Sequence, residues 1–145
     1  MDLKIKKIQE NAIIPTRATE GSAGFDLYAC INEPIIIKKG ERITIPTGIA
    51  VEISDKKYAI FIFARSGLGI KHGISLSNGV GVIDSDYRGE ICVGLINTSN
   101  VDYVINPADR IAQMVLMPIC LPKIILSDEL NSTDRNLGGF GSTGK

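Results

Sequence analysis

Residues that favour turns, namely Gly, Pro, Asn and Asp, interrupt this chain about every ten residues. The segments between them are short and rich in Ile and Val, which favour strands. No helical periodicity extends beyond about two turns. We therefore predict an all-β fold, with strands at residues 34–38, 42–45, 48–53, 58–63, 90–97, 103–105 and 111–119.

Several of these strands are apolar on both faces. In the segment ICVGLIN (91–97), alternation places Ile91, Val93 and Leu95 on one face and Cys92, Gly94 and Ile96 on the other. Such a strand needs cover on two sides. A second sheet in a sandwich would cover one face, and a subunit interface could cover the other.

The length and charge of the chain limit its partners. A chain of 145 residues fits one domain, and its 16 basic and 16 acidic residues cancel, with no run of Lys or Arg longer than two. We expect no electrostatic binding of nucleic acid or of a membrane surface. The apolar stretches are shorter than the roughly 20 residues of a membrane-spanning helix, and MDLKIKKIQE at the N-terminus lacks a signal-peptide apolar region.

The cysteines and the histidine argue for a cytoplasmic protein without a zinc site. Cys30, Cys92 and Cys120 are odd in number and far apart, which fits a reducing compartment better than a disulfide framework. His72 is the single histidine, which argues against a His-based triad.

The segment GVIDSDYRGE (81–90) is the first candidate site. In an extended segment Asp84 and Asp86 would point the same way, so they could share a cation or activate and orient a water. The alternative is an ordinary β-turn, in which Asp and Gly are common.

The segment ARSGLG (64–69) is the second candidate. A strand there runs into Arg65, Ser66 and Gly67 before a short helical turn that Ser66 could cap. Backbone amides, a hydroxyl and a guanidinium together suit a phosphate, although a capped surface connection would have the same sequence.

Two further segments could complete a site. The tail RNLGGFGSTG (135–144) combines glycines that admit an anion with Phe140, which could stack on a base, although it could equally be a loose tail. In GSAGFDLYA (21–29), Asp26 stands between two apolar residues, and by itself could simply face solvent on an edge strand.

These four segments, with ADRIAQM (108–114) as a fifth, match in order and spacing the five motifs of the trimeric dUTPase family, which the chain resembles over nearly its whole length. The resemblance implies a distorted β jelly roll of the β-clip type, which forms a homotrimer with threefold symmetry and active sites drawn from all three chains. Residues 1–131 would form the domain. Residues 132–145 would be a flexible arm that closes over the site.

The resemblance also implies the reaction. Enzymes of this family use Mg²⁺ to hydrolyse dUTP to dUMP and pyrophosphate, which supplies dUMP for thymidylate synthesis and keeps uracil out of DNA. Asp84 would be the general base for a water that attacks the α-phosphorus. Mg²⁺ would be held mainly by the substrate phosphates, and Asp26 would reach it through water.

The remaining roles implied by the resemblance concern substrate binding. Arg65, Ser66 and the amide of Gly67 would grip the α- and β-phosphates, with Gln113 and Arg110 nearby. Arg135 would pair with the γ-phosphate, Phe140 would stack on uracil, and Gly141, Ser142 and Thr143 would close over the chain. The uracil edge would be read in the hairpin 78–83 and at the strand after it, by Asn78, Gly81, Val82, Ile83, Ile91 and Cys92. Tyr87 would pack on the deoxyribose and exclude a 2′-hydroxyl.

The sequence departs from the family pattern at a few positions. Asn136 and Ala108 stand where glycine is usual, and Asn136 is expected to keep a left-handed backbone. Three alternatives remain open. They are a dCTP deaminase of the same fold, a regulatory module that uses dUTP to switch partner binding, and a structural jelly roll.

Overall fold

The computed structural model describes residues 2–139, and strands dominate it. Along the chain the elements are β1 (Leu3–Lys7), β2 (Phe25–Tyr28), β3 (Ile35–Ile37), β4 (Arg42–Pro46), β5 (Ile49–Ile53), β6 (Tyr58–Phe63), α1 (Ser66–His72), β7 (Ile74–Leu76), β8 (Gly81–Ile83), β9 (Cys92–Asn97), β10 (Tyr103–Ile105) and β11 (Arg110–Pro118). The predicted all-β class is confirmed.

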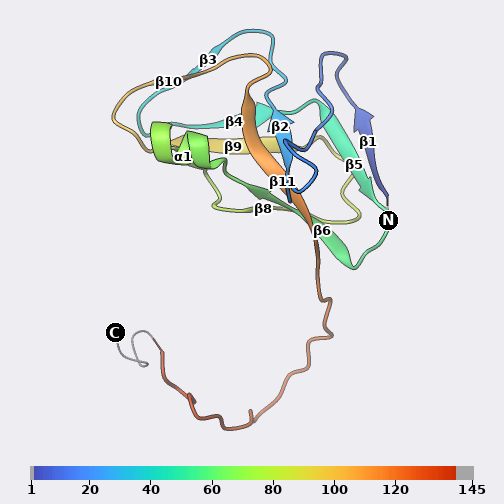
Figure 1. The fold of residues 1–145 in the computed structure, drawn as a ribbon. Coiled ribbons are helices and arrows are strands. Elements are labelled where there is room, and N and C mark those ends of the chain that lie inside the picture. The colour runs from blue at the N-terminus through green and yellow to red at the C-terminus, as the bar shows by residue number, and fades with distance from the viewer. Residues whose placement is uncertain (1, 140–145) are drawn as a thin grey trace.

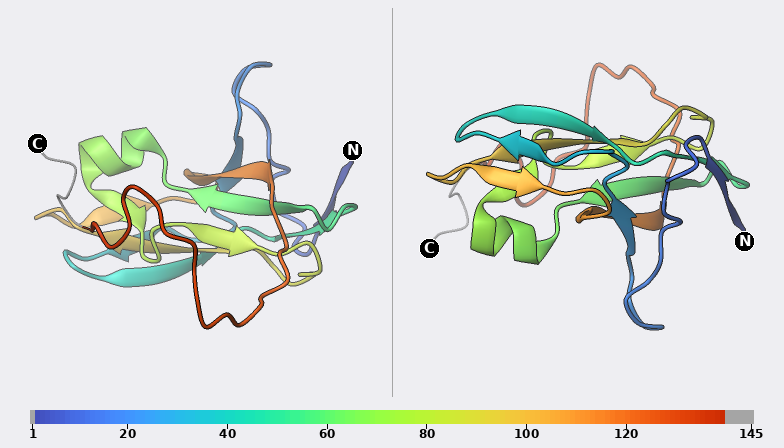
Figure 2. Two further views of the ribbon diagram at one scale, coloured as in Figure 1. Left: turned by 90° about the horizontal axis from the view of Figure 1, so that it is seen from below. Right: turned by 90° about the horizontal axis from the view of Figure 1, so that it is seen from above.

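The strands form two larger sheets and two pairs, all antiparallel. One sheet has the order β2-β11-β6-β8 and the other the order β4-β9-β7, while β1 pairs with β5 and β3 with β10. The helix α1 and the strand β1 lie at opposite ends of this body (Figures 1 and 2). Neighbours in a sheet are mostly distant in sequence, so long-range pairing holds the strands together.

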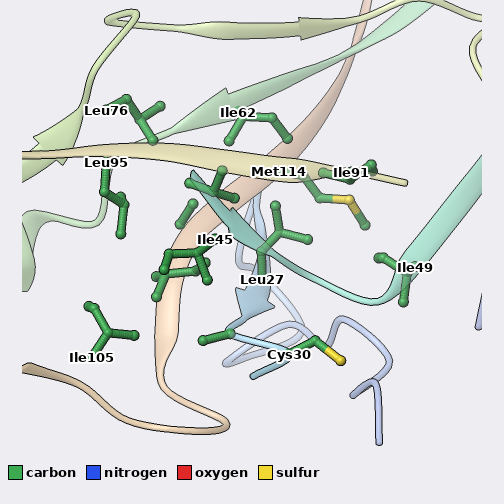
Figure 3. Close-up of a cluster of buried hydrophobic side chains, with 14 of the residues drawn as sticks. Leu27, Cys30, Ile45, Ile49, Ile62, Leu76, Ile91, Leu95, Ile105 and Met114 are labelled. Carbon is green, nitrogen blue, oxygen red and sulfur yellow. The ribbon is translucent and has the colours of Figure 1, made fainter. Parts of the chain in front are cut away.

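The core lies between the two larger sheets. Leu27 and Met114 come from the first sheet and Ile45 and Leu95 from the second, and all four are almost completely buried. Figure 3 shows these side chains together with Ile62 in one apolar cluster. Dense packing of this kind fixes the strand register, because a slip of one residue would turn each of these side chains outward.

All seven predicted strands are present. The bounds of 58–63 and 103–105 match the prediction, and the ends of the other five differ by at most two residues. The structure adds β1, β7 and β8, which the sequence pattern did not single out as strands, and it confirms the strand-like character of β2. β7 and β8 are each three residues long, and β1 carries three lysines among its five residues. Neither feature gives a strong strand signal.

The predicted role of Ser66 as a helix cap is wrong. The N-cap position of α1 is Arg65, which is extended and makes no side-chain capping bond, and Ser66 is the first helical residue. At the other end Gly73 adopts a left-handed φ of 68°, as is usual after a helix.

Beyond β11 the described chain carries no helix or strand and runs away from the body (Figure 1). It exposes large apolar side chains, among them Ile124 at 93%, Leu126 at 95% and Leu130 at 91%.

The strand that the sequence showed as apolar on both faces also leaves one face partly exposed. In β9, Val93 and Leu95 are buried, while the opposite face remains partly open.

Among residues 2–139, no helix has the length and apolar character that crossing a membrane requires.

Candidate functional site

The hairpin around β8 forms one side of a small cavity. β8 pairs with β6, where Gly81 lies opposite Ile62. The cavity measures about 120 Å³, and five of the predicted uracil-reading residues line it, namely Asn78, Gly81, Val82, Ile83 and Cys92. The sequence did not indicate the other lining residues, which are Ile62, Leu76, Val93 and Gly94.

Glycines let the walls of this cavity lie close together and leave the space between them unfilled. A Cβ at Gly81 would lie 3.0 Å from the Cβ of Ile62, and one at Gly94 would lie 2.6 Å from the Oγ of Ser77. Gly79 turns the hairpin with a φ of 74°. The two strand walls can therefore approach closely without side chains filling the space between them.

Of the predicted pair Ile91 and Cys92, only Cys92 reaches the cavity. Ile91 is fully buried. Its N–H donates to the oxygen of Ile49 at 2.9 Å, and its own oxygen accepts the N–H of Thr47 at 3.2 Å. Both backbone groups of Ile91 are thus used inside the fold. Cys92 is exposed, but partial desolvation of its thiol, followed by the negative charge of Glu90, raises the pKa of that thiol.

The segment after β8 is a turn, so the extended geometry considered for Asp84 and Asp86 is wrong. The N–H of Tyr87 donates to the oxygen of Asp84 at 3.1 Å, which closes a β-turn over residues 84–87. Asp84 is exposed and directly follows Ile83, a residue that lines the cavity. A carboxylate is therefore presented to solvent at the cavity edge.

A second cluster is centred on Asp26 in β2. Its Oδ1 accepts a hydrogen bond from the Nε of Arg65 at 3.1 Å, and its Oδ2 accepts one from a guanidinium nitrogen of Arg110 at 3.2 Å. Arg65 also donates to the backbone oxygen of Arg110 at 3.1 Å. The side chain of Asp26 is only 13% exposed, so this carboxylate fixes two cations in one place.

A strand irregularity helps to aim Arg110. In the pairing of β2 with β11, Arg110 lies opposite Tyr28, whereas Ala112 lies opposite Leu27, so Ile111 is an extra residue. Because Tyr28 and Asp26 share a face of β2, Arg110 becomes a diagonal neighbour of Asp26. Bulges often direct side chains at functional sites in this way.

Gln113 and the start of α1 lie next to this cluster. Gln113 pairs with both Asp26 and Phe63, and its Nε2 donates to the oxygen of Ala64 at 3.3 Å. Ser66 and Gly67 form the first turn of α1, whose N–H groups have no acceptor within the helix. A Cβ added to Gly67 would meet nothing within 4 Å, so a ligand can approach this backbone.

A second cavity of about 180 Å³ adjoins the arginines. Its lining includes residues that the sequence did not indicate, and the full set is Arg65, Leu68, Tyr103, Ile105, Asp109 and Arg110. Desolvation and the charge of Asp109 raise the pKa of the Tyr103 phenol, while Arg65 acts in the opposite direction. The phenol is therefore neutral near pH 7 and can donate a hydrogen bond.

The donor set fits an indirect metal site and not a direct one. Among residues 2–139, no three acidic, cysteine or histidine side chains are grouped to hold a metal ion. Both oxygens of Asp26 already accept a guanidinium, although each retains a lone pair for a metal-bound water. Mg²⁺ keeps several waters when it binds with substrate phosphates, so this arrangement suits it.

The predicted tail residues are only partly placed. Arg135 is exposed, and its Nε donates to the oxygen of Gly138 at 3.0 Å, within the tail itself. Asn136 has a positive φ of 42°, as expected for its place in the motif. Phe140, Gly141, Ser142 and Thr143 lie outside the described residues.

Comparison with known proteins gives a consistent result. A sequence model of the dUTPase family matches residues 10–144. The deoxyuridine 5'-triphosphate nucleotidohydrolase of Paraburkholderia xenovorans is 46% identical over 145 residues, which cover all of this chain and 98% of that protein.

Two solved structures show the same fold. A mutant dUTPase of Staphylococcus bacteriophage 80alpha with dUpNHpp is similar with a TM-score of 0.90 and 26% identity, covering 99% of each chain. A mutant dUTPase of phage phi11 of S. aureus, which coordinates a structural Mg(II) ion, is similar with a TM-score of 0.82 and 25% identity, covering 91% of this chain and 100% of that one.

Proposed function

The chain belongs to the dUTPase family and hydrolyses dUTP to dUMP, and we propose that Asp84 is the general base of this reaction. Asp84 would take a proton from the water whose oxygen attacks the α-phosphorus. The bond from the α-phosphorus to the bridging oxygen breaks, and pyrophosphate leaves. The observation that carries this proposal is the position of Asp84 directly after the hairpin that lines the cavity.

The cavity beside the hairpin is the proposed uracil site. The amide of Asn78 can both donate and accept, which suits the edge of a pyrimidine. Val82 and Ile83 line the same space and would crowd a 5-methyl group, which would exclude thymine. Direct exclusion is needed, because an extra methyl in a roomy apolar pocket changes binding by only about 1 to 3 kcal/mol.

The cluster around Asp26 is the proposed phosphate site. Arg65 and Arg110, held by Asp26, would pair with phosphate oxygens, and Ser66, the amide of Gly67 and Gln113 would add hydrogen bonds. Mg²⁺, when bound to the phosphates, would supply charge neutralisation of the leaving pyrophosphate. Asp26 would hold a water of that ion, and Arg135 would meet the γ-phosphate.

We further propose that three copies of the chain complete each site. The uracil cavity and the cavity beside Arg65 share no lining residue, which supports their contribution by different subunits. Exposed apolar side chains outside the arm, such as Ile36 at 56% and Val101 at 69%, also support burial against another copy. Sedimentation equilibrium with the intact chain would test this assembly.

The first experiment measures pyrophosphate release from dUTP, dTTP, dCTP and UTP with magnesium. We expect release from dUTP alone, and we expect Asp84→Asn to lower kcat by at least about 1000-fold while dUTP binding persists. Asp86→Asn is the matched control, since it changes the other carboxylate of the same turn and should retain most activity. If Asp84→Asn retains wild-type kcat, the assignment of the base is wrong.

The proposed lid has its own test. Deletion of residues 132–145 removes Arg135 and the glycine-rich segment, yet the described part of it, 132–139, lies outside the strands and the helix. We expect kcat for dUTP to fall by about 100-fold or more with little change in Tm. A large drop in Tm, with kcat retained at low temperature, would instead assign the arm a structural role.

A further inference from the structure

The aromatic ring of Tyr87 lies against the backbone of Gly89. A Cβ built on Gly89 would stand 2.4 Å from the Oη of Tyr87, 2.6 Å from its Cζ and 3.1 Å from its Cε2. A Cβ atom essentially never approaches a non-bonded heavy atom within 3.0 Å, so no side chain fits at position 89 while the ring stays where it is.

The requirement for glycine here does not come from the backbone. Gly48, Gly73 and Gly79 have positive φ, which favours glycine whatever surrounds them, but Gly89 does not. Any residue could adopt the backbone of Gly89. The three heavy atoms nearest to an added Cβ all belong to the side chain of Tyr87, so this side chain is what excludes a larger residue.

The surface on which the ring lies is firmly anchored. The hydroxyl of Tyr87 donates to the oxygen of Glu90 at 3.0 Å. The carboxylate of Glu90 in turn accepts the N–H of Gly48 at 2.7 Å, and the following residue, Ile91, is fully buried. A side chain at position 89 would therefore displace the ring, because the backbone beneath it is held by the core.

We propose that Gly89 is a positioning residue that sets where the Tyr87 ring stands, and through it the discrimination between deoxyribose and ribose. This inference rests on the proposed function and, within it, on the role that the family resemblance implies for Tyr87, which is to pack on the sugar. In the sequence, Tyr87 closes the turn that begins at Asp84 and precedes Cys92, which lines the proposed uracil cavity. A displaced ring would lose its contact with the sugar and would no longer exclude the 2′-hydroxyl.

The experiment compares the wild-type chain with Gly89→Ala, Tyr87→Ala and the double variant. For each protein, kcat and KM are measured with dUTP and with UTP, and Tm is measured without nucleotide. We expect Gly89→Ala to raise KM for dUTP about tenfold and to lower the ratio of kcat/KM for dUTP over UTP about tenfold. We expect kcat for dUTP to change less than about threefold, because Asp84 keeps its turn.

The double variant separates positioning from a general structural effect. If Gly89 acts through Tyr87, then adding Gly89→Ala to Tyr87→Ala should change the selectivity ratio by less than about twofold. An equal loss of selectivity in both backgrounds would overturn the inference. An unchanged ratio in the single variant Gly89→Ala would do the same.

A measurement without substrate tests whether Gly89 positions the Tyr87 ring independently of whether that ring packs on the sugar. NMR of the tyrosine ring resonances in the free protein should show a shifted Tyr87 signal in Gly89→Ala, with the other three tyrosines unchanged. An unmoved Tyr87 signal refutes the positioning role whatever the kinetics. A moved signal with selectivity unaffected by Tyr87→Ala would instead refute the sugar-packing role of Tyr87.

Discussion

Asp26 holds Arg65 through a 3.1 Å hydrogen bond from the guanidinium Nε to its Oδ1. The two residues are 39 positions apart in the chain, and Arg110, which binds the other oxygen, is 84 positions from Asp26. One carboxylate thus sets the positions of two cations before substrate arrives. Preorganised charge of this kind costs no rearrangement during the reaction.

Asp26→Asn should therefore impair catalysis strongly. The amide is neutral and can accept with one atom only, so the two guanidinium groups would repel each other and separate. We expect kcat/KM for dUTP to fall roughly 100-fold and the free energy of unfolding to fall by about 1 to 3 kcal/mol. Steady-state kinetics and urea denaturation measure the two effects.

The matched control is Glu52→Gln, which makes the same change in the exposed pair of Glu52 with Lys4. It should alter neither kcat/KM nor the urea midpoint measurably, since exposed ion pairs contribute little. An equally active Asp26→Asn variant would show that the arginines need no anchor.

Gly48→Ala should destabilise the fold severely. Its φ of 70° disfavours a side chain, and an added Cβ would lie 2.5 Å from the Sγ of Cys30 and 2.7 Å from the Cβ of Ala12. Both neighbours are buried, so neither can move freely. We expect a loss of about 3 kcal/mol or more in the free energy of unfolding.

Gly40→Ala serves as the comparison, because Gly40 has a similar φ of 75° but nothing lies within 4 Å of its added Cβ. It should cost only about 1 kcal/mol, the price of the left-handed backbone alone. Equal losses in the two variants would mean that crowding at Cys30 is relieved by movement of the chain.

Ala108→Gly should stabilise the protein. Ala108 has a φ of 65°, in the left-handed region where a Cβ is strained, and it stands at a position where the family usually has glycine. We expect a gain of about 0.5 to 1 kcal/mol, measured as a higher Tm. The same change at Ala59, a buried residue at the second position of β6, should instead lower Tm, because glycine weakens a strand.

Alkylation of Cys92 should inactivate the enzyme with a characteristic pH dependence. Partial desolvation and the charge of Glu90 raise the pKa of the thiol, so the reactive thiolate forms mainly above the pH at which a free cysteine ionises. Inactivation by iodoacetamide should therefore be slow near pH 7 and should accelerate as the pH rises. dUMP should protect the thiol, because Cys92 lines the proposed uracil cavity.

The alkylation requires a Cys120→Ser background, since Cys120 is also exposed whereas Cys30 is buried. Mass spectrometry should then find one modified cysteine for each inactivated chain. Full activity after complete modification of Cys92 would exclude this residue from the nucleotide site.

The sequence predicted the strands where a long apolar pattern supports them, as in β6 and β9. It did not predict β7, which follows the end of α1 at Gly73 directly, although it did predict β10, which has the same length of three residues. For the segment 84–87 the residues alone slightly favoured a turn over an extended metal or water site, since Asp and Gly are ordinary turn residues. The bond from Tyr87 to Asp84 decides this point in favour of a turn.

The sequence predicted the part of the candidate site whose residues are close together in the chain. Residues of the hairpin 78–83 are close in sequence, so their grouping around one cavity follows from local structure. The contacts of Asp26 with Arg65 and Arg110 join distant strands, and only the folded sheet places them together. Tyr103 carried no signal, because its place beside Arg65 depends on how β10 packs.

The pairing of β2, β11 and β6 also has a consequence for the dynamics of the protein. Gln113 in the middle strand faces Asp26 on one side and Phe63 on the other, two residues before Arg65. Backbone amides in such a central ladder exchange with solvent mainly when the whole domain opens. The proposed phosphate-binding residues are thus attached to strands whose backbone amides should exchange slowly, so heating should separate these residues from one another only when this sheet opens.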